Sequence, residues 1–140
     1  MTTRAHLAIE KNAIRRKYTV ASGQATTAGC GVAFAAADGE VQTSSAAGAC
    51  FGIALETKAA GELVDVLLLG FAIAKVKVAV GGTATRGVYA QTLTAPGAFA
   101  NKVLGGGSVV QPIQGIFLES GVAGDLVSLL ITGAFNGVSA

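Results

Sequence analysis

The chain alternates short apolar runs with glycine-containing turns, and one such unit occurs twice. GIALETKAAGELVDVLLLG occupies residues 52–70, and GIFLESGVAGDLVSLLITG occupies residues 115–133. The two align without a gap over nineteen positions, of which ten are identical. In each copy, two apolar stretches of strand length flank a small residue, a glycine and an acid, which favours a β-hairpin. The glycines that bracket these stretches make a helix the weaker interpretation.

The two turns are predicted to be structural. Gly61 and Gly124 supply the positive φ that a tight turn needs, and an acid follows each of them. These acids, Glu62 and Asp125, complete the small residue, glycine and acid pattern of the turn.

A third segment has the two-residue period of a half-buried strand. Residues 73–80 read IAKVKVAV, which places Lys75 and Lys77 on one face. This alternation, with β-branched residues, favours a strand with its other face in the core. The positions predicted to face the core are Ala74, Val76, Val78 and Val80.

These units form two tandem repeats, which we place at about residues 17–70 and 73–133. Upstream of the hairpins, residues 17–34 align with residues 73–90 at a separation of 56, and the second copy then carries seven extra residues. Two copies are too few for a solenoid, and an open sheet edge would invite aggregation. We therefore predict a mainly β, barrel-like single domain over residues 18–140, with internal pseudo-duplication. The two copies are expected to close on each other as one pseudo-symmetric barrel or sandwich.

The composition agrees with a compact β protein that has a narrow interior. Of the 140 residues, 51% are hydrophobic but only 6% are aromatic, and 20 are glycine. The apolar run at residues 66–74 is far shorter than the roughly 20 residues of a membrane-spanning helix, so we predict no membrane contact. Cys30 and Cys50 are too few for a disulfide framework and are interpreted as buried thiols.

Basic residues are concentrated at the N-terminus. Residues 1–17 hold five of the ten Lys and Arg residues against one acid, Glu10, so this segment carries +4 and the remainder −2. We predict that residues 1–17 form an extended arm that is solvated or docks on another protein. Direct nucleic-acid contact is disfavoured, because the body supplies no basic surface to continue such a site.

The sequence contains no set of residues typical of an active site. His6 is the only histidine and lies in the arm, far in sequence from any residue placed as a nucleophile. Glu56 and Glu119 recur identically, and two carboxylates can hydrolyse glycosides. Their duplicated placement at hairpin ends favours a structural role instead, such as accepting hydrogen bonds from backbone N–H groups at the turn. We therefore predict that the protein is not an enzyme and uses no metal or cofactor.

The repeated hairpin also carries a family resemblance. Small chains rich in Ala, Gly and Val, with this hairpin near a G-V-A strand, resemble bacteriophage capsid cement proteins, also called head decoration proteins. The matching segments are GVAF at residues 31–34 and the hairpins at residues 51–70 and 114–133, within residues 18–133. The resemblance implies a β-tulip type of fold and a homotrimer on the outside of an expanded phage head.

The resemblance further implies that the protein stabilises the capsid by bridging subunits of the major capsid protein. It would be made in the bacterial cytoplasm and end at the virion surface, with residues 1–17 as the docking arm. The implied contact residues are Arg4, Leu7, Ile9, Ile14, Arg15, Arg16 and Lys17.

Three alternatives stay open at this point. One alternative is another virion part, such as a head-fibre base or tail accessory. A second alternative is a small ligand- or glycan-binding barrel. The last needs an aromatic platform, whereas the six Phe and two Tyr are spread along the chain. A dimer remains an alternative to the trimer.

Overall fold

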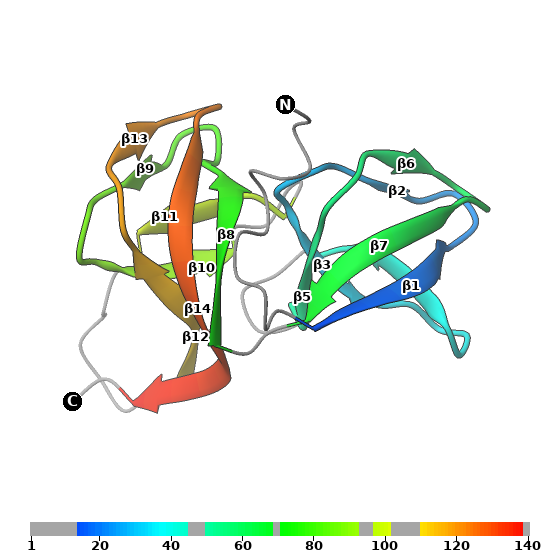
Figure 1. Cartoon of the computed structure of the whole chain (residues 1–140). Helices are drawn as coiled ribbons and strands as arrows, with labels where there is room; N and C mark the ends of the chain where they lie inside the picture. Colours follow the sequence, from blue (N-terminus) through cyan, green and yellow to red (C-terminus); the bar gives the residue numbers. More distant parts are fainter. Residues whose placement is uncertain (1–13, 45–49, 69–70, 93–96, 102–109, 139–140) are drawn as a thin grey trace.

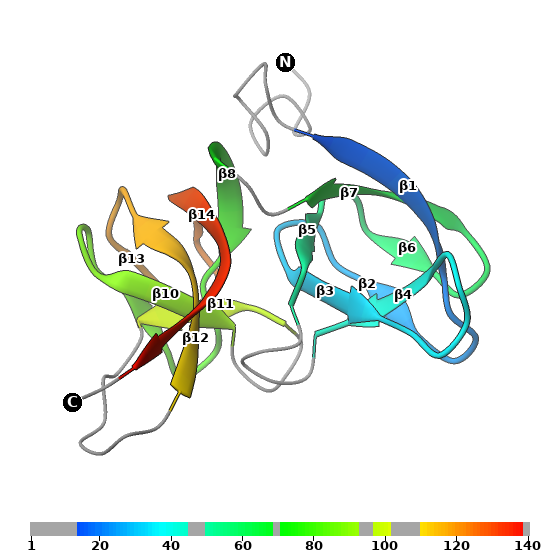
Figure 2. The ribbon, with the colours of Figure 1, turned by 90° about the horizontal axis from the view of Figure 1, so that it is seen from below.

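The structure is a computed structural model that describes residues 14–44, 50–68, 71–92, 97–101 and 110–138 (Figure 1). Every regular element described is a β-strand, and the strands form two bodies that lie side by side (Figures 1 and 2). The first body contains β1 (Arg15–Val20), β2 (Ala25–Thr26), β3 (Gly31–Phe34), β4 (Glu40–Thr43), β5 (Gly52–Ala54), β6 (Lys58–Ala59) and β7 (Leu63–Leu68). The second contains β8 (Phe71–Lys77), β9 (Thr83–Ala84), β10 (Tyr89–Thr92), β11 (Phe99–Asn101), β12 (Val110–Phe117), β13 (Gly121–Val122) and β14 (Leu126–Val138).

The first body is a closed barrel with the strand order β1-β4-β3-β5-β7. β1 and β4 run parallel, and the other neighbouring strands of the ring run antiparallel. Side chains alternate between the two faces of each strand, so one face fills the interior, and small β-branched residues suit so narrow a space. The buried interior cluster consists of Tyr18, Val20, Val32, Val41, Ala54, Val64 and Val66.

The second body has the equivalent strand order, β11-β10-β12-β14-β8. A parallel bridge between Val78, directly after β8, and Phe99 on β11 joins the two outer strands of this sheet. Its interior is filled by larger side chains, among them Phe99, Phe117 and Leu129, which are all fully buried. The prediction of a mainly β, barrel-like fold is therefore confirmed. The expectation that the two copies close one barrel together is wrong, because each copy pairs its own strands.

The two barrels have the same strand register. The pairing of β3 with β4 recurs in β10 and β11 with every partner 58 residues later. The pairing of β5 with β7 recurs in β12 and β14 with every partner 63 residues later. The second copy therefore carries five extra residues (63 − 58), and they fall between β11 and β12.

The predicted separation of 56 residues for the upstream segments is wrong by two, and so is the predicted insertion of seven. In the observed register, Lys17 corresponds to Lys75, because they pair with Asp65 and Ser128 at equivalent places in their barrels. A slip of two residues leaves every side chain on the same face of its strand. The hydrophobic pattern therefore could not detect the error.

The boundary of the predicted arm is also corrected. β1 begins at Arg15 and pairs with β7 along residues 15–19, so Arg15, Arg16 and Lys17 belong to the barrel. The carbonyl of Ile14 accepts a hydrogen bond from the N–H of Leu68, which extends this pairing by one residue. Backbone pairing with β7 thus overrides the local charge of the segment. Of the other predicted contact residues, those that lie outside the described residues are Arg4, Leu7 and Ile9.

The alternation predicted for residues 73–80 holds only as far as Val78. Ala74, Val76 and Val78 are buried, but Val80 is 87% exposed. The chain leaves the strand at this point and turns at Gly81, whose φ is +79°. Val80 therefore belongs to a turn and does not face the core.

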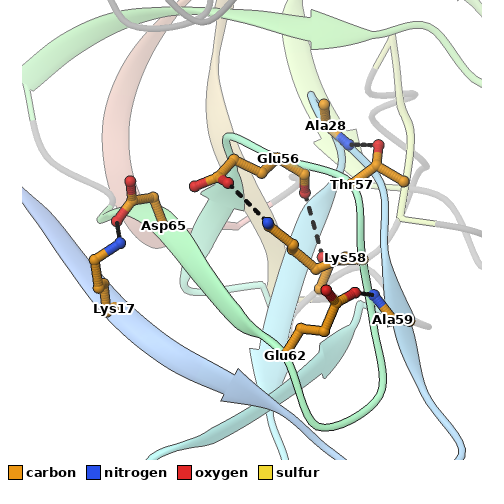
Figure 3. Close-up of polar contacts among 9 residues, drawn as sticks. Lys17, Ala28, Glu56, Thr57, Lys58, Ala59, Glu62 and Asp65 are labelled. Atoms are coloured by element: carbon orange, nitrogen blue, oxygen red, sulfur yellow. Dashed lines mark hydrogen bonds and ion pairs between the residues drawn. The ribbon is translucent and has the colours of Figure 1, made fainter.

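Both hairpin turns are held by the acid that follows the glycine. Gly61 and Gly124 have φ values of +83° and +89°. In each turn the carboxylate accepts a hydrogen bond from the backbone N–H three residues earlier, at 2.7 Å for Glu62 (Figure 3) and 2.9 Å for Asp125.

The two barrels share buried surface. The outer face of β5 and β7 contributes to the same apolar cluster as the interior of the second barrel. The residues of the first barrel in this cluster are Cys50, Ile53, Leu55 and Leu67. A smaller cluster places Cys30 against Ala79, Ala98 and Ala100 of the second barrel.

Backbone hydrogen bonds complete this junction. The carbonyl of Gly29 accepts from the N–H of Lys77 at 2.9 Å, and the N–H of Gly31 donates to the carbonyl of Gly97 at 2.8 Å. The chain just before β3 therefore lies between two segments of the second barrel. This approach needs glycine, because a Cβ on Gly97 would lie 2.6 Å from the Gly31 oxygen.

The first barrel closes differently at the equivalent positions. There the N–H of Thr19, which corresponds to Lys77, donates directly to the carbonyl of Gly39, which corresponds to Gly97, at 3.0 Å. At this position the first barrel is closed by its own hydrogen bond. In the second barrel, the equivalent groups of Lys77 and Gly97 bond instead to Gly29 and Gly31 of the first barrel.

Gly97 and Gly39 offer a matched test of the junction. Both have positive φ, +82° and +78°, so alanine at either costs roughly 1–2 kcal/mol of backbone strain. A Cβ on Gly39 meets nothing within 4 Å, whereas one on Gly97 strikes the backbone of Gly31. We predict that Gly97→Ala lowers the free energy of unfolding by ~1–3 kcal/mol more than Gly39→Ala in urea denaturation. Equal losses would contradict the close contact between the barrels.

Candidate interaction surface

The described residues hold no grouping suited to metal binding. Within the ranges that the structure covers, no three His, Cys, Asp or Glu side chains lie together in a way that could hold a metal ion. The same ranges include no helix that is long and apolar enough to cross a membrane. His6 lies outside them.

Three aromatic side chains meet at one end of the first barrel. Phe34 and Phe51 stack face to face, with ring centroids 3.8 Å apart and planes 2° from parallel. Tyr18 meets the edge of this stack, 5.5 Å from Phe51 and 6.3 Å from Phe34. We call Tyr18, Phe34 and Phe51 the aromatic mouth, because they cover the open end of the barrel interior.

The aromatic mouth is only partly covered by the rest of the described chain. Tyr18 is buried and Phe51 is half-buried, but Phe34 is 62% exposed. The guanidinium carbon of Arg16 lies 5.7 Å from the Tyr18 ring centroid, within range of a cation–π contact. Two residues before Arg16, Ile14 is 67% exposed. Large exposed apolar side chains gathered in this way are typical of a contact surface.

Alternation along β1 decides which predicted contact residues reach this mouth. Arg16 and Tyr18 point to the mouth and interior, whereas Lys17 points to the outer face. There Lys17 forms an ion pair with Asp65 on β7, with a nitrogen–oxygen distance of 3.1 Å (Figure 3). Asp65 is buried, so Lys17 already has an internal role. The structure therefore separates Lys17 from Ile14 and Arg16, which the sequence had grouped.

The aromatic mouth contradicts the expectation that the aromatic residues are scattered. Tyr18, Phe34 and Phe51 are more than fifteen residues apart in sequence, yet β1, β3 and the start of β5 bring them together. No local pattern marks them, because only the pairing of distant strands places them side by side. The first barrel therefore does hold a cluster of aromatic side chains of the kind that a ligand-binding barrel needs.

The recurring glutamates have different partners in the two barrels. Glu56 pairs with Lys58 at 3.4 Å within its own hairpin (Figure 3). Glu119 accepts a hydrogen bond from the hydroxyl of Ser128 at 2.7 Å and from the ammonium of Lys75 at 2.9 Å. The Ser128 hydrogen bond, followed by that of Lys75, lowers the pKa of the Glu119 carboxyl.

Both cysteines are buried, with 1% exposure for Cys30 and 2% for Cys50. They are free thiols. Burial raises the pKa of Cys30, and it raises that of Cys50 to about 12. Neither thiol is therefore placed to act as a nucleophile.

Comparison with known proteins gives an informative likeness of fold. No protein-family model and no curated protein matches the chain. Among solved structures, the chain is similar to the head fiber gp8.5 N base in bacteriophage phi29. The sequences are 18% identical, and the match covers 88% of this chain and 98% of that chain with a TM-score of 0.64. This likeness shows a shared fold that includes most of both barrels.

The Glu119 contacts predict a pH-dependent contribution to stability. Because folding lowers the pKa of this carboxyl, its contribution is present above the unfolded value of about 4.3 and is lost as the pH falls through the folded value. We expect Glu119→Gln to destabilise the protein by less than ~1 kcal/mol at neutral pH, since the group is largely exposed. The difference from the parent protein should shrink in thermal melts below about pH 4.3.

Ser128→Ala provides the control for this prediction. In that background Glu119 has lost its strongest partner, so Glu119→Gln should cost less and show a weaker pH dependence. An undiminished effect would mean that Ser128 is not the cause.

Proposed function

We propose that this protein is a structural component of a bacteriophage virion that binds the outer surface of the head. The observation that carries the proposal is the fold likeness to a phage head-fibre base, which spans nearly the whole of that chain. The resemblance of the repeated hairpin to capsid cement proteins supports the same location.

The physical character of the body agrees with this role. Two barrels that share a core form a stiff unit, and the net charge of residues 18–140 is only −2. A body of this kind suits a scaffold attached in many copies to a repetitive lattice, where weak contacts add through avidity. Catalysis and cofactor binding form no part of the proposal.

We assign attachment to residues 1–13, upstream of the corrected boundary of the barrel. This segment contains Arg4 and Lys11 for acidic groups of the major capsid protein, and Leu7 and Ile9 for apolar grooves. Arg15 and Arg16 extend the basic character onto the barrel surface. Lys17 is a weaker candidate, because Asp65 already pairs with it.

Two finer roles fit this location. The fold likeness favours the base of a head-attached structure, because that is the part of the phi29 protein that the chain resembles. The hairpin resemblance favours a cement protein, a trimer that bridges major capsid protein subunits. Heating heads with and without the bound protein separates the two roles: a cement protein raises the temperature of DNA release, and a base leaves it unchanged.

Location is tested by mass spectrometry of separated heads and tails. We expect the protein with heads, in many copies per particle. Recovery with tails alone would overturn the proposal in favour of a tail accessory.

Deletion of residues 2–13 tests the attachment segment. The barrels should stay folded, with an unchanged thermal melt, because β1 and its pairing with β7 are intact. We expect at least ~10-fold weaker co-sedimentation with heads. Full binding by the truncated protein would assign attachment to the barrels.

A matched charge change separates specific attachment from general electrostatics. Neutralising Arg4 and Lys11 together should weaken binding and reduce its dependence on salt. Neutralising Lys58 and Arg86, which lie on the two barrels, removes the same charge and should have little effect.

A further inference from the structure

The interface between the two barrels is formed by two different surfaces. The second barrel contributes the open end of its interior that is equivalent to the aromatic mouth, which we call its mouth end. The first barrel contributes the outer face of β5 and β7. At this interface a Cβ on Gly31 would lie 2.8 Å from the Thr92 methyl group, and one on Gly29 would lie 3.0 Å from the Leu126 side chain. Each barrel carries both kinds of surface, so the duplication leaves one mouth end and one outer face without a partner barrel.

The free mouth end belongs to the first barrel and is enriched in large exposed side chains. In the second barrel the equivalent positions are small and covered, with Ala72 at 3% exposure, Ala74 at 1% and Thr92 at 0%. In the first barrel they are Ile14 at 67%, Arg16, which is exposed, and Phe34 at 62%. Leu63, equivalent to Leu126, is 57% exposed. We call Ile14, Arg16, Phe34 and Leu63 the free end.

The free outer face belongs to the second barrel. Its counterparts in the internal interface, Ile53, Leu55 and Leu67, are at most 2% exposed. The equivalent residues of the second barrel keep their apolar character, although Leu118 is 38% exposed and Tyr89 is 43% exposed. We call the following set the free back: Tyr89, Ile116, Leu118 and Leu130.

Exposed apolar side chains concentrate on these two surfaces. Eight large hydrophobic residues are exposed among those described, and five of them lie on the free end or the free back. They are Ile14, Phe34, Leu63, Tyr89 and Leu118. Of the other three, Leu126 flanks the internal interface, and Val80 and Val122 lie at turns. Single exposed residues at turns need no partner. Two apolar surfaces that are each equivalent to one side of the internal interface are typical of a contact site.

We propose that chains of this protein associate head to tail, with the free back of one chain packed against the free end of the next. The contact uses, between chains, the same two kinds of surface that join the barrels within a chain. Such an interface joins unlike surfaces, so it generates a closed ring when the rotation per chain permits. The proposed assembly is a closed ring. This inference does not rest on attachment to a phage head.

The contact between chains differs from the internal one in a defined way. Thr19 and Gly39 already bond to each other, and Tyr89 stands where the internal interface has Gly31. The backbone insertion of the internal junction is therefore replaced by side chains, with Phe34 and Tyr89 as the largest. Glu40 and Gln42 stand where the second barrel has Ala98 and Ala100, which gives the contact a polar edge.

Charged substitutions on the two surfaces test the association. Light scattering should give the unmodified protein a mass several times the chain mass of 13.8 kDa. Leu118→Asp and Phe34→Asp should each reduce the mass to that of one chain, with far-UV circular dichroism unchanged. Val80→Asp, at an exposed turn, is the matched control and should keep the parent mass. A monomeric parent at 1 mg/ml, or an oligomer that survives both substitutions, would overturn the proposal.

Crosslinking tests the head-to-tail geometry even where a charged variant fails to fold. Phe34→Cys and Leu118→Cys proteins are treated with a short bis-maleimide, to which the buried Cys30 and Cys50 are poorly accessible. Mixing the two variants should give crosslinked pairs, whereas each variant alone should give none. A Phe34→Cys protein that crosslinks to itself would indicate a two-fold interface and overturn the proposal.

The double variant Phe34→Cys/Leu118→Cys then reports the size of the ring. Its crosslinked ladder should end at a fixed number of chains, which is three if the ring is the proposed trimer. A ladder that ends at another number keeps the ring but rejects the trimer. A ladder without an upper limit would indicate an open filament and overturn ring closure.

Discussion

The close approach of two backbones at Gly29, Gly31 and Gly97 is the constraint on which the architecture depends. Hydrogen bonds of 2.8 and 2.9 Å join the barrels there, and no side chain could be accommodated without displacing them. Because the backbones meet at this distance, the outer face of one barrel can seal the mouth of the other. A duplicated strand pattern thus becomes one body with a common core rather than two barrels on a tether.

The two copies also differ in the size of the residues at equivalent surface positions. Positions that are equivalent in the fold carry small residues where they are covered and large ones where they are free, as Ala72 and Ile14 show. The interiors also differ, since Val41 occupies the place that Phe99 fills in the second barrel, and both side chains are fully buried. The repeat therefore specifies the strand framework, and the substitutions within it distinguish inner from outer surfaces.

The described polar and sulfur-containing side chains serve the structure of the two barrels. The recurring acids hold turns or pair with nearby lysines, and the two thiols are buried. What the described surface offers is apolar contact area at two places and basic charge close to the N-terminus. A stiff body with such surfaces suits the self-association and the attachment proposed above.

The sequence by itself determined the class of the fold, the two hairpins and the turns at Gly61 and Gly124. All of these follow from the order of apolar, small and acidic residues within about twenty positions. It did not determine the two-residue register of the repeat, the start of β1 at Arg15 or the meeting of Tyr18 with Phe34 and Phe51. Strand alternation fixes the face of each side chain but not its partner strand, and partners such as β1 and β4 are far apart in the chain. Only packing in three dimensions selects among pairings that share the same faces, and the tertiary structure therefore decided where the contact surfaces lie.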